Sequence, residues 1–224
     1  MKLLNILSSL FIIGLIGISS CAPGRFIKPL EKGESSVGFN AGGPMILFGD
    51  LTIPVPFSAL YYGYGLHENG TISGGVHLTS LLYKTLQFDL GYTRNLLEQE
   101  KYLPALSLYG GLNIMAGLRA PEVRIYPEID LNAYWEYKND RWMSYLGLSN
   151  WFDPHYNKIE EGSDYRFWRP VIQLGQLYRF GNWELGLEYK MMGPNLDNTR
   201  TVVNYANDLK FGAHGFFLQF SKRF

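Results

Sequence analysis

The sequence contains a single cysteine, Cys21, among its 224 residues, which excludes an internal disulfide. Neither sign of charge is in excess, because Lys and Arg total 20 and Asp and Glu total 20. Nucleic-acid-binding proteins usually carry a basic excess or patch, so this balance argues against nucleic acid as a partner. Charged residues are also few, at 18%, against roughly 25% in typical soluble domains.

A long apolar helix is not indicated either. The mean hydropathy is only −0.08, too low for a helical membrane protein. The apolar run at 10–18 is broken only by glycine, but it is too short to span a bilayer comfortably. Aromatic residues nevertheless make up 16% of the chain. A membrane β-barrel reconciles these facts, because residue alternation hides its apolar surface from sequence averages.

The first 20 residues have the features of a cleaved signal peptide. Lys2 supplies the positive charge, and the apolar run at 10–18 supplies the hydrophobic region. The run leads into Ile18-Ser19-Ser20-Cys21, which resembles the lipobox of bacterial lipoproteins. In that family the chain is cut before the cysteine and the thiol is acylated. The resemblance implies that Cys21 is the lipid-attachment residue.

The residues after Cys21 bear on where the lipid would hold the protein. Ala22 stands where many lipoproteins retained at the inner membrane have an aspartate, so the resemblance implies the outer membrane. Residues 21–34 contain Pro23, Gly24, Pro29 and several charges, and they are expected to form a short lipidated tether. The alternative is an ordinary cleaved signal peptide followed by a chance cysteine.

Alternating apolar and polar residues from position 34 onward predict strands. Along 183–190, for example, Trp183, Leu185 and Leu187 share one face, while Glu184 and Glu188 share the other. The pattern and its turn signals predict ten strands, at 35–48, 57–66, 71–81, 85–94, 103–114, 124–137, 142–152, 167–180, 183–190 and 216–224. Eight strands are the alternative, if the first or the third of these is not a strand.

The last stretch of the sequence carries a family resemblance. Counting back by twos from Phe224 gives Lys222, Phe220, Leu218 and Phe216, so four of the five are large and apolar. This resembles the closing strand of bacterial outer-membrane β-barrel proteins, in which a C-terminal Phe and alternating apolar residues form the assembly signal. Lys222 departs from the pattern, since that family usually has an aromatic or apolar residue there.

The resemblance implies an all-β fold. We expect a single antiparallel up-and-down transmembrane β-barrel over residues 35–224, located in the bacterial outer membrane and anchored by its N-terminal lipid. The expected partners are outer-membrane lipid, the barrel-assembly machinery and other envelope proteins.

The polar faces of the strands would line the interior of such a barrel, because lipid contacts the apolar faces. The predicted lumen polar cluster consists of Asp89, Glu128, Asp130, Glu136, Arg169, Arg179, Glu184, Glu188 and Lys190. Buried charges need partners, so the favoured interpretation is an interior filled by mutually paired charges. The alternative is a small polar conduit or ligand slot, with space left by Gly63, Gly65, Gly91, Gly111, Gly175 and Gly186.

Two short motifs are candidates for catalysis. Asp153 and His155 resemble the acid–His pair of the ten-stranded outer-membrane aspartyl proteases, but the second carboxylate pair of that family is missing. His77 and Thr79 resemble the His-x-Ser pair of outer-membrane lipid A deacylases, with Thr79 in the place of the nucleophilic serine and no identifiable orienting acid. The favoured interpretation of both motifs is structural, as a surface loop and a lumenal polar cluster.

The sequence contains neither a Cys/His cluster nor a glycine-rich phosphate loop, so no metal and no cofactor are expected. The favoured function is that of a small outer-membrane barrel lipoprotein with a structural or interaction role, such as an accessory subunit of an envelope complex. One alternative is a barrel enzyme acting on lipid A or peptides. The other is a narrow channel or ligand-binding barrel.

Overall fold

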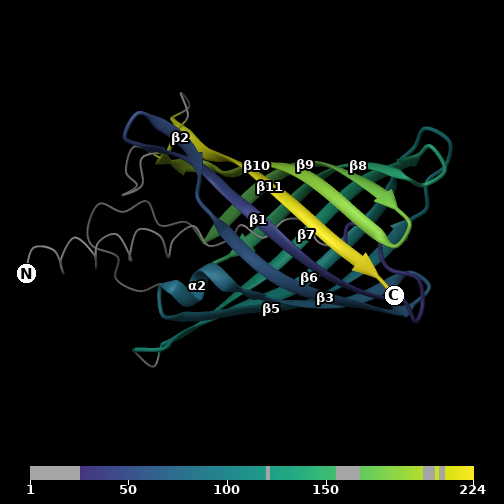
Figure 1. Ribbon diagram of the computed structural model, residues 1–224, viewed down its shortest axis with the longest axis horizontal. Coiled ribbons are helices and arrows are strands. Elements are labelled where there is room, and N and C mark those ends of the chain that lie inside the picture. Colours follow the sequence, from purple (N-terminus) through teal and green to yellow (C-terminus); the bar gives the residue numbers. More distant parts are fainter. Residues whose placement is uncertain (1–25, 120–121, 155–166, 199–204, 207–209) are drawn as a thin grey trace, which may run out of the picture.

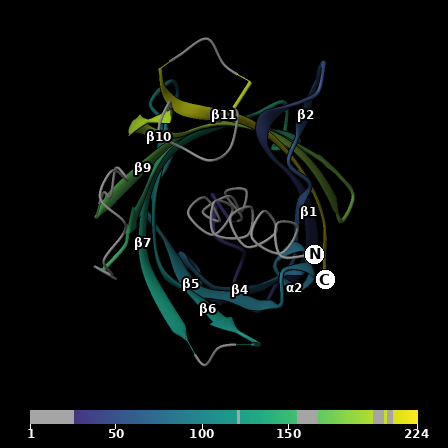
Figure 2. The same cartoon turned by 90° about the vertical axis from the view of Figure 1, so that its left-hand side faces the viewer.

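The computed structural model of the chain describes residues 26–119, 122–154, 167–198, 205–206 and 210–224. Ten long strands, inclined to the barrel axis, wrap into a closed antiparallel barrel (Figures 1 and 2). They are β1 (Ser35–Phe48), β3 (Phe57–His67), β4 (Gly70–His77), β5 (Thr85–Leu97), β6 (Ala105–Gly117), β7 (Val123–Tyr137), β8 (Trp142–Phe152), β9 (Trp168–Phe180), β10 (Trp183–Asp197) and β11 (Phe211–Arg223). The prediction of a ten-stranded up-and-down barrel is confirmed.

The two ends of the barrel differ. At the end that we call the turn end, short turns join β3 to β4, β7 to β8 and β9 to β10. The opposite end, which we call the loop end, carries the short strand β2 (Leu51–Pro54) and the short helix α2 (Leu78–Leu82), as Figure 1 shows. In the part of the chain that the structure describes, no helix is both long and apolar enough to cross a membrane.

The sequence-based boundaries are wrong at three places at the loop end. The strand predicted over 71–81 stops at His77, because Leu78, Leu81 and Leu82 have the spacing of one helical face and form α2. Between the strands predicted over 35–48 and 57–66, the chain forms β2, which pairs with the end of β1 from Met45 to Phe48. The strand predicted over 183–190 is longer, because β10 continues to Asp197 through an irregularity in its pairing with β11.

The barrel closes where β1 pairs antiparallel with β11. Phe39 lies opposite Phe220, and Ala41 lies opposite Leu218. At the turn end, Ser35 and Phe224 exchange backbone hydrogen bonds, with N···O distances of 3.2 and 2.8 Å. The last residue of the sequence therefore completes the seam between the first and the last strand.

Deletion of Phe224 is expected to lower the yield of folded barrel, because it removes both backbone hydrogen bonds to Ser35 and the terminal aromatic side chain. The measurement is the fraction of unheated protein that migrates as the compact, heat-modifiable form on a gel. Phe224→Tyr is the matched control, because it keeps the aromatic ring and the backbone, and it should fold nearly as well as the unaltered chain. An unchanged yield after deletion would contradict the assembly-signal interpretation of this strand.

The apolar face of the barrel points outward and the polar face points inward. On β10, Leu185 and Leu187 are 48% and 53% exposed, whereas Glu184 and Glu188 are 7% and 2% exposed. A soluble barrel would have the opposite arrangement, while a barrel in a bilayer must present apolar side chains to lipid.

Aromatic side chains gather at the turn end of this outer face. Trp183 stacks on Phe220 with 4.9 Å between ring centroids, and Trp142 packs on Tyr178 at 4.6 Å. Lys222, which departs from the apolar pattern of the closing strand, lies over the ring of Trp183 at 5.2 Å. Such a girdle is typical of the membrane–water boundary in outer-membrane barrels.

Candidate functional site

Residues 26–34, which we call the plug segment, fill the lumen at the turn end. Ile27 and Leu30 are only 3% and 1% exposed. The Ser107 hydroxyl of β6 donates to the Ile27 carbonyl at 2.5 Å, and the Leu30 backbone N–H donates to Thr71 Oγ1 of β4 at 2.7 Å. Ile27 also belongs to an apolar cluster inside the barrel, made with Ala105, Tyr134, Met143, Tyr145 and Leu177. The described part of the expected tether is therefore packed against the inner wall.

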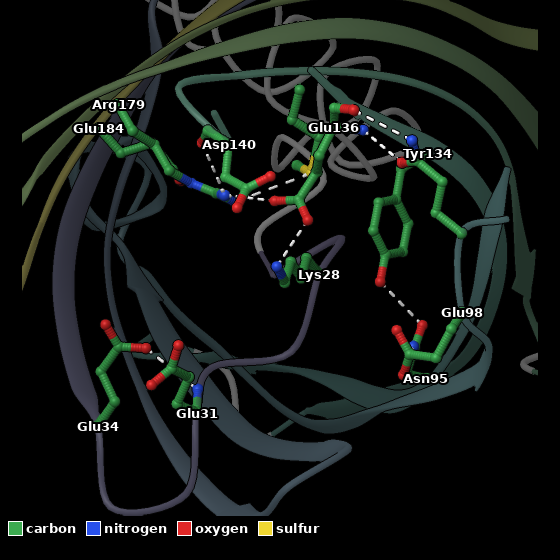
Figure 3. Close-up of polar contacts among 12 residues, drawn as sticks. Lys28, Glu31, Glu34, Asn95, Glu98, Tyr134, Glu136, Asp140, Arg179 and Glu184 are labelled. Carbon is green, nitrogen blue, oxygen red and sulfur yellow. Dashed lines mark hydrogen bonds and ion pairs between the residues drawn. The ribbon is translucent and has the colours of Figure 1, made fainter. Parts of the chain in front are cut away.

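A chain of ion pairs, which we call the ionic chain, begins and ends on the plug segment. Lys28 Nζ lies 2.6 Å from Glu136 Oε2, as Figure 3 shows. Arg179 bridges the other oxygen of Glu136, at 2.5 Å, to Glu184, at 2.8 Å. Arg223 then connects Glu184, at 3.2 Å, to Glu34, at 3.4 Å. Both ends of the plug segment are thus linked electrostatically through β7, β9, β10 and β11.

The space beside the six inward-facing glycines is occupied by other atoms, which argues against the alternative of a conduit or ligand slot and not against the favoured filled interior. Tyrosine rings of the wall lie where a side chain at three of these glycines would be, with Tyr109 against both Gly91 and Gly111 and Tyr145 against Gly175. Leu177 and Gln219 fill the space beside Gly186. The remaining two, Gly63 and Gly65, are covered by the plug segment itself, through the ring of Phe26 and the backbone of Glu31.

The most deeply buried charges lie midway along the lumen. Glu188 and Lys190, with side chains 3% and 4% exposed, are neighbours on the inner face of β10, with 3.4 Å between Oε1 and Nζ. The hydroxyl of Tyr145 donates to the other oxygen of Glu188 at 2.5 Å. Asp130 on β7 interacts electrostatically with both charges and hydrogen-bonds to Ser149. Glu188 therefore pairs with Lys190, while Arg179 belongs to the ionic chain.

The structure gives His77 an acidic partner that the sequence did not reveal. His77 Nε2 lies 2.8 Å from Asp89 Oδ2, and both residues are buried. Asp89 was not identifiable as the orienting acid because it lies on β5, the next strand of the sheet, and only the pairing of β4 with β5 brings it near.

Thr79 is not placed as a nucleophile for His77. It lies on α2 and not on a strand beside His77. Its single hydroxyl hydrogen is donated to the Pro56 carbonyl at 2.8 Å, and its oxygen accepts the backbone N–H of Ser58 at 2.9 Å. These contacts tie α2 to the start of β3, which is a structural role.

The second catalytic motif is only partly described. Asp153 forms an ion pair with Arg169 at 3.0 Å at the loop end of the lumen, while His155 lies outside the described residues, as does Cys21. Among the described residues, no group of three His, Cys, Asp or Glu side chains could hold a metal ion.

All nine residues of the predicted lumen polar cluster lie on inward-facing positions. The structure joins five of them into two groups, because Glu136, Arg179 and Glu184 belong to the ionic chain and Glu188 pairs with Lys190. Four further residues complete these groups and were not singled out from the sequence, namely Lys28, Glu34, Arg223 and Tyr145. Arg223 and Tyr145 could have been found from strand alternation, whereas Lys28 and Glu34 precede the first strand and carry no such signal.

Comparison with known proteins gives relatives by fold alone. No protein-family model matches the sequence, and no curated protein matches it. An outer membrane channel from Pseudomonas putida F1 is 11% identical, with 92% of this chain and 100% of that chain covered and a TM-score of 0.50. The translocator domain of the autotransporter NalP from Neisseria meningitidis is 12% identical, with 98% and 95% covered and a TM-score of 0.46.

A closed barrel with a mainly apolar exterior and a charged interior suits a membrane-spanning sheet, because the ten long strands leave no open edge between them and most outward-facing side chains are apolar. The chain has the fold of the bacterial outer-membrane β-barrel proteins.

Proposed function

We propose that the protein is a non-catalytic component of the outer membrane, with a structural or interaction role and with other envelope proteins as partners. The observation that carries this proposal is the occupied turn end of the lumen, where the plug segment and the ionic chain lie inside the barrel. Such a barrel offers its outer face and its loop end as binding surfaces for partners. It offers solutes no path through the lumen. Thr79 is hydrogen-bonded to Pro56 and Ser58, so its position does not favour the alternative of a barrel enzyme that uses His77 and Thr79.

The unaltered protein is expected to form no ion-conducting pore, because the plug segment blocks the turn end. Current through planar lipid bilayers containing the purified, folded barrel measures this directly. Purification in mild detergent followed by mass spectrometry of associated proteins tests the interaction role. Steady conductance by the unaltered chain would contradict the closed-lumen proposal, and purification as a single species at native abundance would contradict the role as a subunit.

The second candidate is a narrow channel whose lumen is closed in this structure. It is favoured by one observation: the closure is made by a segment that is not part of the barrel wall. Removal of residues 26–34 from the lumen would leave all ten strands and their pairing in place. One protein of the same fold is described as an outer membrane channel, which makes this function compatible with the architecture.

We also propose that Cys21 carries a lipid, since the lipobox-like residues precede it directly. Mass spectrometry of the mature N-terminus is expected to show diacylglyceryl- or triacylglyceryl-cysteine at position 21. Cys21→Ser should lose this mass and mislocalise or assemble slowly, but it should still give a heat-modifiable barrel, because the strands lie elsewhere in the chain. An unmodified Cys21 or a mature chain cut at another position would contradict the proposal.

A further inference from the structure

We propose that the plug segment is a displaceable gate, and that the lumen behind it conducts small inorganic cations once the segment leaves. This inference rests on the second function proposed above and names its gate and its class of solute.

The plug segment is held mainly by two apolar side chains. Ile27 and Leu30 are buried, while the polar attachments of residues 26–32 are two hydrogen bonds, to Ser107 and Thr71, and the ion pair of Lys28 with Glu136. The last two residues of the segment, Gly33 and Glu34, are joined to the wall by backbone hydrogen bonds with Gly65 and by the ion pair of Glu34 with Arg223, so they form the fixed end about which residues 26–32 move. The Lys28 side chain is still 35% exposed, so water can replace its partner at little cost. The strand pairing of the wall uses none of these contacts. Displacement therefore costs the burial of two side chains but leaves the barrel intact.

Departure of the plug segment opens space on one side of the lumen only. Gly63 and Gly65 on β3 have no side chains of their own, and the surfaces beside them are covered by Phe26 and Glu31 of the plug segment. Tyr61 packs edge-on against Phe26 with 5.8 Å between ring centroids, so its ring would also lose a neighbour. At Gly91, Gly111 and Gly175 the covering rings belong to the wall and would remain. The opened path would thus follow β3 and its neighbours.

The charges of the described wall favour cations along such a path. Seven carboxylates face the lumen or its loop-end mouth, namely Asp89, Glu128, Asp130, Glu136, Asp153, Glu184 and Glu188. Four permanent cations face them, namely Arg169, Arg179, Lys190 and Arg223. At the rim, Arg124 pairs with Glu122 and leaves this excess unchanged. Withdrawal of residues 26–32 removes Lys28 from Glu136 and leaves Glu34 paired with Arg223, and rings of carboxylates select cations in other pores.

The test places unfavourable charges on the plug segment without altering the wall. In the double variant Ile27→Asp/Lys28→Glu, a carboxylate would enter the apolar cluster around Ile27, and a second would face Glu136. The plug segment should leave the lumen, and planar bilayers should show discrete current steps that the unaltered protein lacks. In a KCl gradient the reversal potential should show that K⁺ is more permeant than Cl⁻.

Two controls separate gating from damage to the barrel. Lys32→Glu makes the same charge change as Lys28→Glu, but on an exposed residue of the plug segment, and it should leave the lumen closed. The second control adds Leu30→Cys and Thr71→Cys to the double variant in a Cys21→Ser background, where a disulfide can form beside the Leu30–Thr71 hydrogen bond. The oxidised protein should be closed, and a reducing agent should open it. Heat-modifiable migration shows in every case that the barrel is folded.

Each outcome bears on one proposal. A folded Ile27→Asp/Lys28→Glu variant without current steps would overturn the gate, and current steps with a preference for Cl⁻ would overturn the cation assignment. Opening that persists in the oxidised cross-linked protein would also overturn the gate, since the path would then lie elsewhere. Current through the unaltered protein would instead contradict the closed lumen itself, which keeps the two failures distinct.

Discussion

Leu187→Arg is expected to lower the stability of the folded barrel by about 2–4 kcal/mol, the cost of a cation on the lipid face near the bilayer midplane. Leu187 lies mid-strand on β10, opposite Leu218 of β11, and is 53% exposed on the outer surface. The measurement is the folded fraction in lipid vesicles along a urea series, read from the migration of unheated samples. Leu187→Phe is the matched control and should remain close to the unaltered protein, because it keeps an apolar side chain.

The direction of the faces can be measured independently of stability. In a Cys21→Ser background, an environment-sensitive dye is attached to a cysteine at position 187 and, in a second protein, at position 188. Lipid-soluble quenchers should quench the dye at 187 and not at 188, because Leu187 faces outward and Glu188 faces the lumen. The reverse pattern, or no quenching at either position, would be incompatible with the barrel described above.

Lys190→Met is expected to destabilise the barrel by about 3–5 kcal/mol, the usual cost of breaking a buried ion pair. Its ammonium group lies 3.4 Å from Glu188, in a part of the lumen where both side chains are almost completely buried. Without it, the carboxylates of Glu188 and Asp130 would interact across the lumen with no cation between them. The same urea series in vesicles reports the loss.

The double variant Glu188→Gln/Lys190→Met provides the control for this prediction. It removes both charges of the pair, so it should recover part of the stability lost in Lys190→Met, and the recovered free energy measures their coupling. Tyr145 can still donate its hydroxyl hydrogen to an amide oxygen at position 188. No recovery would show that Lys190 acts through its volume or through Asp130, and not through Glu188.

Most of the wall could be predicted from the sequence because a strand with one lipid-facing and one lumen-facing side imposes a period of two on its residues. Leu187 and Glu188 show why: lipid and lumen differ so strongly that neighbouring residues must differ as well. The pattern failed where neither environment applies. At 78–82 the chain turns into α2 beyond the membrane-spanning sheet, and at 51–54 it forms β2 with all four residues exposed.

The plug segment could not be predicted for a different reason. Its buried residues, Ile27 and Leu30, are two apolar residues among prolines, glycines and charges, which is also the composition of a flexible tether. Their burial depends on Ala105, Tyr134 and other wall residues that lie far away in the sequence. The partners of Lys28 and Glu34, at Glu136 and Arg223, are equally remote. Contacts that form only when the barrel closes join residues far apart in the sequence, so the local sequence pattern does not predict them.

The place of the plug segment also constrains the order of assembly. Residues 26–34 lie inside the ring that is sealed by the pairing of β1 with β11, so either the segment threads through a finished ring or the ring forms around it. A sheet that is still open exposes the binding surfaces for Ile27 and Leu30 directly, which favours the second route. The attachments at Thr71, Ser107 and Glu136 belong to β4, β6 and β7, far from the seam. A partly formed sheet can therefore bind the segment and curve around it. The pairing of β1 with β11 then closes the barrel as the last step.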